Sequence, residues 1–287
     1  MAKAATTTKP GAVAKISESA NMPAFMRDDT GMGTENIGQR DMEVARIKLM
    51  QGLSPELQEY NDLRPGYFFH TAMGLNLGET LRVVPLYMDM RYILWRPRDM
   101  GGGILARADD GIHWQPADRT FEVKLDKKDG GATVSWSTAR TVAASGLAEW
   151  GSMNPDDDES PPAATLMYNY VVAFPDHPDW VPAVMSLQRK AVRIAKKLNG
   201  KLKIGGAPLF GRILEVKSVD DKNAVGQMFK NYQILPAGFV TDQNQYEQYR
   251  QMHESFKSAG LNIRDLEDAQ DDVVDTDEPK DDGKKKY

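Results

Sequence analysis

The sequence predicts a mainly β protein with α additions, arranged as an OB-fold-like barrel with a basic helix before its last strands. Three observations support this fold class: short runs of alternating side chains separated by Gly or Pro turns, one helical pattern inserted among them, and a second helical pattern after the last run. The expected divisions are a disordered N-terminal arm over 1–42, a barrel domain over 43–240, a C-terminal helix over 241–260 and an acidic disordered tail over 261–287.

Composition limits the protein class. The chain has 287 residues and is 41% hydrophobic, which is enough for one core of roughly 150–200 residues with flexible ends, or for two small domains. It contains no cysteine, so disulfides, zinc–thiolate sites and cysteine nucleophiles are excluded. We expect neither a membrane span nor a secretory signal, because no apolar run approaches the required length.

The first half of the chain is predicted to consist largely of strands. The run over 80–98 is the longest, and Pro85 should place it at an edge or bend it. Strict alternation would put Val84, Leu86 and Met88 on one face and Val83 on the other. Shorter strands are expected over 44–50, 121–125, 133–136 and 166–174, and alternation places Tyr168 and Tyr170 on one face of the last of them. A helical turn is expected after Ser54, a hairpin turn at Asp110-Gly111 and an exposed loop over 139–165.

The second half is predicted to begin with an amphipathic helix over 184–200. Ser186 is its expected N-cap and Asn199-Gly200 its expected end, with Leu187 and Ala191 on the apolar face. Two strands follow, over 209–219 and 226–239. A last helix, capped by Thr241 or Asp242 and ended by Gly260, should pack its aromatic side chains on the body.

Positive charge gathers in and around the predicted basic helix. Between Asp179 and Glu215 there are eight basic residues and no acidic one, although the whole chain has a formal net charge of -5. Such a local excess is typical of a surface that binds a polyanion. The candidate phosphate-binding residues are Arg96, Arg98, Arg189, Lys190, Arg193, Lys196, Lys197, Lys201 and Lys203.

Aromatic residues interleave with these cations on extended segments. Unpaired bases stack on such aromatic rings while Lys and Arg neutralise phosphates. The candidate stacking residues, of which Trp95 and Trp114 lie beside turns, are Tyr92, Trp95, Trp114, Trp136, Phe229 and Tyr232. A solvated helix face and aromatic side chains of the core would explain the same pattern, and sequence leaves that alternative open.

Several short sequence segments are informative beyond the composition of the chain. They are ARIKLMQGLSPEL, GYFF, YILWRPRDMGGG, DDGIHW, PLFGRILEV and NAVGQMFKNYQI. Together they resemble the single-stranded DNA-binding proteins of tailed bacteriophages, over about residues 44–240. The resemblance implies an OB-fold that coats and protects single strands during phage DNA replication, recombination and repair, in the bacterial host cytoplasm if the protein is phage-encoded.

The same resemblance implies a role for the acidic C-terminus. Residues 265–287 hold ten carboxylates and four lysines. Tails of this kind recruit replication or recombination proteins and compete with DNA for the basic groove. The matching residues here are Asp271, Asp272, Asp275, Asp277, Glu278, Asp281, Asp282 and Tyr287, whereas the lysines at 284–286 depart from the usual tail.

We expect no enzyme, no cofactor and no metal. The four histidines are far apart in sequence, no GxSxG or Walker motif is present, and the acidic run over 156–159 is typical of a solvated loop. Two other functions stay open: a transcription-related protein that binds duplex DNA or RNA, and a structural or scaffolding protein of a virion. Sequence does not decide the oligomeric state, and a homo-oligomer is one of the options.

Overall fold

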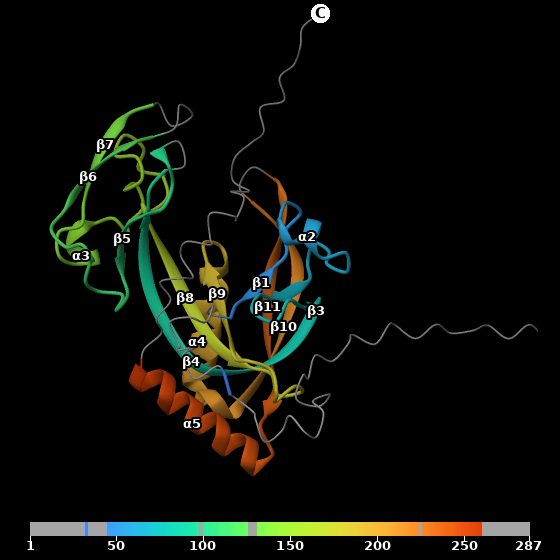
Figure 1. Ribbon diagram of the computed structural model, residues 1–287. Helices are drawn as coiled ribbons and strands as arrows, with labels where there is room; N and C mark the ends of the chain where they lie inside the picture. The colour runs from blue at the N-terminus through green and yellow to red at the C-terminus, as the bar shows by residue number, and fades with distance from the viewer. Residues whose placement is uncertain (1–31, 34–44, 98–99, 126–130, 224–225, 260–287) are drawn as a thin grey trace, which may run out of the picture. The chain divides into compact units, whose positions relative to one another are not determined.

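The computed structural model of the protein describes residues 32–33, 45–97, 100–125, 131–223 and 226–259 (Figure 1). The chain divides into two units, Met1–Met42 and Glu43–Tyr287, and the second contains the strands and helices described below. The predicted arm (apart from 32–33), Arg98 and the acidic tail, including all eight of its candidate residues, lie outside the described residues.

The strands of the described residues form three antiparallel sheets. The largest has the order β11-β10-β4-β8-β9, with β5 also paired to β4. Its strands are β4 (Thr80–Trp95), β5 (Ile104–Ala108), β8 (Ala164–Ala173), β9 (Ala183–Gln188), β10 (Arg212–Lys222) and β11 (Met228–Phe239). A second sheet contains β1 (Ile47–Leu49), β2 (Phe68–His70) and β3 (Leu75–Gly78), and a third pairs β6 (Thr120–Lys124) with β7 (Thr133–Ser137).

Few helices accompany the sheets in the part of the chain that the structure describes. They are α2 (Glu56–Glu59), α3 (Val142–Ser145), α4 (Ala191–Ile204), the 3-10 turn η5 (Leu209–Gly211) and α5 (Gln243–Ala259). The mainly β class is therefore confirmed. Within the described residues the strands do not close into a barrel, so the OB-fold assignment stays a prediction.

A bulge in β4 changes the predicted side-chain faces. The register of β4 against β8 shifts between Pro85 and Tyr87, as the bend expected at Pro85 requires. Val83 and Met88 consequently line the same core, whereas Val84 and Leu86 face another. The strict alternation expected for this run was wrong because one extra residue inverts the two faces beyond Pro85. β4 is also an interior strand rather than an edge.

The predicted helix over 184–200 is divided in the structure. Residues Ala183–Gln188 form β9, which pairs with β8 from Val172 to Met167 and buries Leu187. Arg189 takes a positive φ of 53°, and the helix begins after Lys190 and continues to Ile204. Ser186 is therefore no N-cap, and Asn199-Gly200 lies inside α4. Pairing with β8 overrides a helical spacing that Leu187 and Ala191 fit by coincidence.

The principal core is formed by α4 and the strands that pack against it. Ala191, Ala195 and Leu198 of α4 join the strand residues of this core. α4 contacts both β9 and β11, the two outer strands of the largest sheet. β8 contributes Tyr168, Tyr170 and further alternate residues to this core, as sequence predicted.

Helix α5 covers another part of the sheet. Tyr249, Met252 and Phe256 pack on β4 and β8 side chains, and the His253 Nδ1 donates to the Leu86 carbonyl over 2.7 Å. The Asp242 carboxylate accepts a hydrogen bond from the Gln245 N–H over 2.7 Å, which caps the helix. The predicted C-terminal helix and its packing on the body are confirmed.

A smaller lobe is built from β5, β6, β7 and α3. Trp114 and Trp136 form its core with Leu94, Val123 and Val142. The predicted strand pair over 121–136 is confirmed as the β6–β7 hairpin. The segment over 139–165 is more ordered than expected, because α3 buries Val142 in this core.

Candidate nucleic-acid interface

The solvent-facing side of α4 is a continuous cationic surface. Ala191, Ala195 and Leu198 turn the helix's apolar side inward. Its exposed charged side chains are Arg193, Lys196, Lys197, Lys201 and Lys203. Among the residues that the structure describes, none of these five forms an ion pair. We call this set the α4 face, and its charge is available to an external anion.

The N-terminal end of α4 contacts the β10–β11 hairpin. The Lys190 ammonium lies 5.3 Å from the centroid of the Phe229 ring and donates to the Lys222 carbonyl. Cation–π contacts of this kind hold both partners in place. A hydrogen bond from the Asn231 amide lowers the pKa of the neighbouring Asp221 carboxyl. Lys190 and Phe229, predicted separately as phosphate and stacking residues, are therefore neighbours.

The C-terminal end of α4 contacts the opposite end of the same hairpin. The Arg212 guanidinium donates to the carbonyls of Leu202 and Ala207, each over 3.3 Å, and lies 5.9 Å from the Phe239 ring centroid. Phe239 is 58% exposed. Helix α4 thus follows the hairpin with an aromatic ring near each end. Sequence reasoning named Phe229 as a stacking residue but missed Phe239, although its place at the end of an alternating run was a signal.

Two of the predicted stacking residues belong to the interior, and a third packs against it. Trp114 and Trp136 are only 1% and 3% exposed, and the Trp114 indole N–H donates to the Ser145 hydroxyl over 3.0 Å. Tyr232 packs against Phe68 with ring centroids 5.9 Å apart, and burial raises the pKa of its phenol. The structure does not support Trp114 and Trp136 as stacking residues, because both fill the core of the smaller lobe. Tyr232 is half-buried against the principal core.

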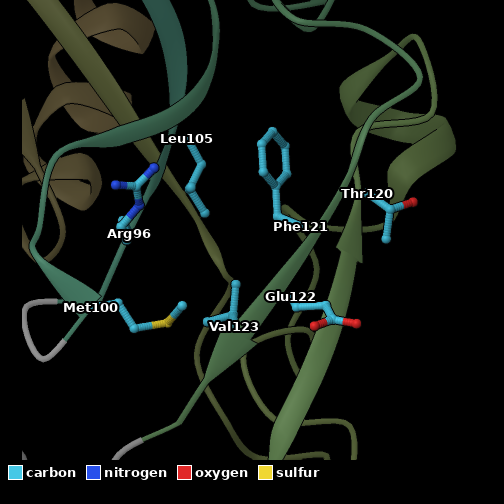
Figure 2. A pocket seen from close by; sticks show the side chains of 7 residues that line it. All are labelled: Arg96, Met100, Leu105, Thr120, Phe121, Glu122 and Val123. Atoms are coloured by element: carbon cyan, nitrogen blue, oxygen red, sulfur yellow. The ribbon is translucent and has the colours of Figure 1, made fainter.

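Tyr92, Trp95 and Arg96 lie at the other end of β4. Tyr92 packs on the core of the smaller lobe, Trp95 is half-buried, and Arg96 is exposed. A pocket of about 420 Å³ opens here, lined by Arg96, Met100, Leu105 and residues 120–123 (Figure 2). Arg96 and the α4 face therefore belong to different structural elements, which the sequence pattern did not reveal.

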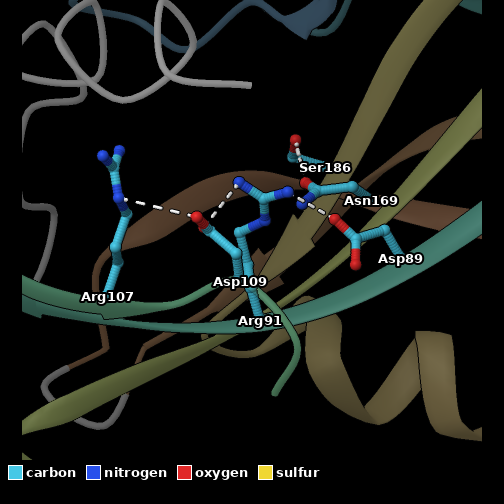
Figure 3. A network of polar contacts seen from close by, with 6 residues as sticks. All are labelled: Asp89, Arg91, Arg107, Asp109, Asn169 and Ser186. Atoms are coloured by element: carbon cyan, nitrogen blue, oxygen red, sulfur yellow. Dashed lines mark hydrogen bonds and ion pairs between the residues drawn. The ribbon is translucent and has the colours of Figure 1, made fainter. Parts of the chain in front are cut away.

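A buried charge network occupies a separate place on β4 and its neighbours (Figure 3). Arg91 is 3% exposed and pairs with Asp89 and, over 3.3 Å, with Asp109. Arg107 lies 3.6 Å from the same Asp109. Alongside, the Ser186 hydroxyl donates to the Asn169 side-chain oxygen over 2.7 Å. The charged side chains compensate one another and join β4 to the β5 segment, while the Ser186–Asn169 hydrogen bond joins β9 to β8, so these contacts stabilise the fold.

The four histidines occupy four different surroundings. His70 bonds the Val181 carbonyl, His113 bonds Asp110, His177 stacks on Trp180, and His253 bonds Leu86. In the described part of the chain no group of three or more His, Asp or Glu side chains is placed to hold a metal ion. No helix among the described residues is long and apolar enough to cross a membrane.

Comparison with known families supplies the next observation. The family model described as Pam3 phage gp34-like protein matches residues 15–262. The chain belongs to this family. No curated protein and no solved structure matches it.

In this member of the Pam3 phage gp34-like family, the remaining candidate site residues among those that the structure describes fall into two groups. The first is the α4 face with Arg189 and Lys190, which precede the helix, and Phe229 of β11, whose ring Lys190 contacts. The second contains Tyr92, Trp95 and Arg96 at the end of β4. The first group brings exposed cations and an aromatic ring onto one surface, and it is the better candidate for binding a polyanion.

Proposed function

We propose that the protein binds single-stranded DNA without sequence preference through the α4 face and the adjoining β10–β11 hairpin. One observation carries the proposal: five exposed cations without ion-pair partners among the described residues line α4, while Lys190 stands over Phe229 at its start. Cations alone would suit any polyanion. The aromatic rings beside them favour a strand whose bases are unpaired.

The binding mechanism follows from these side chains. Phosphates displace counterions as they meet Arg193 and the four lysines, so affinity should fall steeply with salt. Phe229 and the exposed Phe239 offer ring faces near opposite ends of α4, and bases stack on such faces whatever their sequence. The proposed architecture is an open OB-like arrangement, in which α4 contacts both outer strands of the sheet.

The biological role that we propose is protection of single strands during phage DNA replication, recombination or repair, in the host cytoplasm. Membership of a family described by a phage protein supports this setting. The acidic tail would compete with DNA for the α4 face and would recruit replication or recombination proteins once displaced. The proposal involves no catalysis and no cofactor.

Titration of fluorescently labelled oligo-dT and a matched duplex, followed by anisotropy at two salt concentrations, tests the function. We expect tight binding of oligo-dT, weaker binding of duplex and loss of affinity at the higher salt. Preference for the duplex would favour the transcription-related function. Absence of binding to either ligand at low salt would refute the proposal.

A second candidate is a structural or scaffolding role in the virion. Its support is an exposed apolar set near the end of the hairpin and of α4, where Ile204 is 89% exposed and Leu235 and Phe239 are also exposed. Such side chains often mark protein–protein contacts. Sedimentation of the purified protein decides this point: large homo-oligomers with little affinity for oligonucleotides favour the structural role.

A further inference from the structure

We propose that the pocket beside Arg96 receives one base of the bound single strand, as a contact point separate from the α4 face. The inference rests on the proposed function and extends it by assigning a base-binding subsite to the smaller lobe. The pocket's lining includes an aromatic ring, aliphatic side chains and an exposed guanidinium. The base of one nucleotide can stack on the ring and its phosphate can bind the guanidinium.

The pocket is formed by the β4–β5 hairpin on one side and β6 on the other. The backbone N–H of Arg96 donates to the Gly103 carbonyl over 2.8 Å, which holds the two sides of the hairpin together. The Lys124 N–H donates to the Met100 sulfur over 3.1 Å and ties the hairpin to β6. Backbone contacts on both sides therefore hold the pocket in shape before any ligand binds.

The pocket walls are apolar. Phe121, Leu105 and Met100 are half-buried, and each packs on the core of the smaller lobe while keeping part of its surface accessible. Val123 is fully buried beneath them, and Phe121 pairs across the hairpin with the buried Trp136. The volume of about 420 Å³ lies within the range of small-molecule sites, about 300–1,000 Å³. A base can stack on Phe121 without a change in the core.

Charge favours a nucleotide over an apolar peptide side chain. In Figure 2 the Arg96 side chain lies on the opposite side of Leu105 from Phe121, whereas Thr120 and Glu122 point away from these apolar side chains. Glu122 also lines the pocket, and the Arg96 guanidinium is the group there that can bind a phosphate. An apolar peptide side chain has no use for that guanidinium, but the phosphate that accompanies each base does.

Two conservative variants test the subsite. Phe121→Leu keeps the apolar packing and removes the ring, so affinity for oligo-dT should fall roughly 5- to 150-fold. Arg96→Gln removes the exposed charge, and the slope of log K against log salt should become shallower by about 0.7. Arg119→Gln is the matched control, because Arg119 is exposed just before β6 and does not line the pocket. Its effects should be small.

Photo-cross-linking locates the contact directly. Oligo-dT carrying 5-iodouracil is irradiated with the wild-type protein, and cross-linked peptides are identified by mass spectrometry. We expect Phe121 among the cross-linked residues. Trp150 is the internal comparison, since it is 72% exposed in the same lobe but lies outside the pocket.

The outcomes separate this inference from the proposed function. Binding that Phe121→Leu and Arg96→Gln leave unchanged, with no cross-link at Phe121, would overturn the subsite alone. Failure of the wild-type protein to bind oligo-dT at low salt would overturn both. Thermal unfolding of Phe121→Leu confirms that any loss of affinity comes from a folded protein.

Discussion

Replacing three lysines of the α4 face should make DNA binding much less sensitive to salt. The variant Lys196→Gln/Lys197→Gln/Lys201→Gln removes three exposed charges from one side of the helix. Because none of the three is paired with a carboxylate among the described residues, their removal should leave no acid uncompensated. Lysine and glutamine have similar helix propensities, so α4 itself should persist.

The size of the effect follows from the number of charges. Each phosphate neutralised on a single strand contributes about 0.7 to the slope of log K against log salt, so three lost contacts reduce the slope by about 2. Over a fourfold rise in salt concentration, the wild-type protein should therefore lose about 20-fold more affinity than the variant. At low salt the variant should also bind more weakly in absolute terms.

Anisotropy titrations of labelled oligo-dT across a salt series measure both quantities. Lys257→Gln is the control, since Lys257 is exposed on α5 and belongs to no part of the proposed surface. An unchanged slope in the triple variant, or an equal change per charge in the control, would refute the assignment of α4 as the phosphate-binding surface.

Three further predictions concern the core, a helix cap and the tail. Trp114→Ala should destabilise the fold by about 3–5 kcal/mol, because it empties a fully buried site, and chemical denaturation measures the loss. Asp242→Ala should cost about 1 kcal/mol of stability by removing the cap of α5, whereas Asp242→Asn should cost less; unchanged melting of the Ala variant would contradict the capping role. A chain ending at Gly260 should bind oligo-dT more tightly than the full protein, most visibly at low salt, and equal or weaker binding would contradict competition by the tail.

The elements with strong local signals were predicted well. Alternation placed Tyr168 and Tyr170 on one face of β8, and both line the principal core. The C-terminal helix was recognisable from its cap and its aromatic spacing, and α5 buries Tyr249 as expected. In both cases the local pattern and the tertiary packing favour the same conformation.

Errors arose where distant strands decide the outcome. The segment Ala183–Gln188 has helical spacing with the residues after it, but its hydrogen bonds go to β8. The bulge at Pro85 inverts the faces of β4, and alternation alone does not locate such an insertion. Sequence also cannot tell a surface tryptophan from a core one, which is why Trp114 and Trp136 were misassigned.

The candidate site was predicted in part. The cations of α4 form one surface because a helix brings them together locally. The juxtaposition of Lys190 with Phe229 and that of Arg96 with Phe121 join segments that are distant in the chain, so no spacing rule could foretell either. Phe121 was overlooked as a candidate binding residue for the same reason.

Lysine footprinting of the wild-type protein tests the central claim most directly. Lysines are acetylated briefly with and without saturating oligo-dT, and the modified peptides are quantified by mass spectrometry. DNA bound along α4 should protect Lys196, Lys197, Lys201 and Lys203, while Lys257 on α5 should react equally in both samples. Full reactivity of the α4 lysines in the presence of bound DNA would contradict the account.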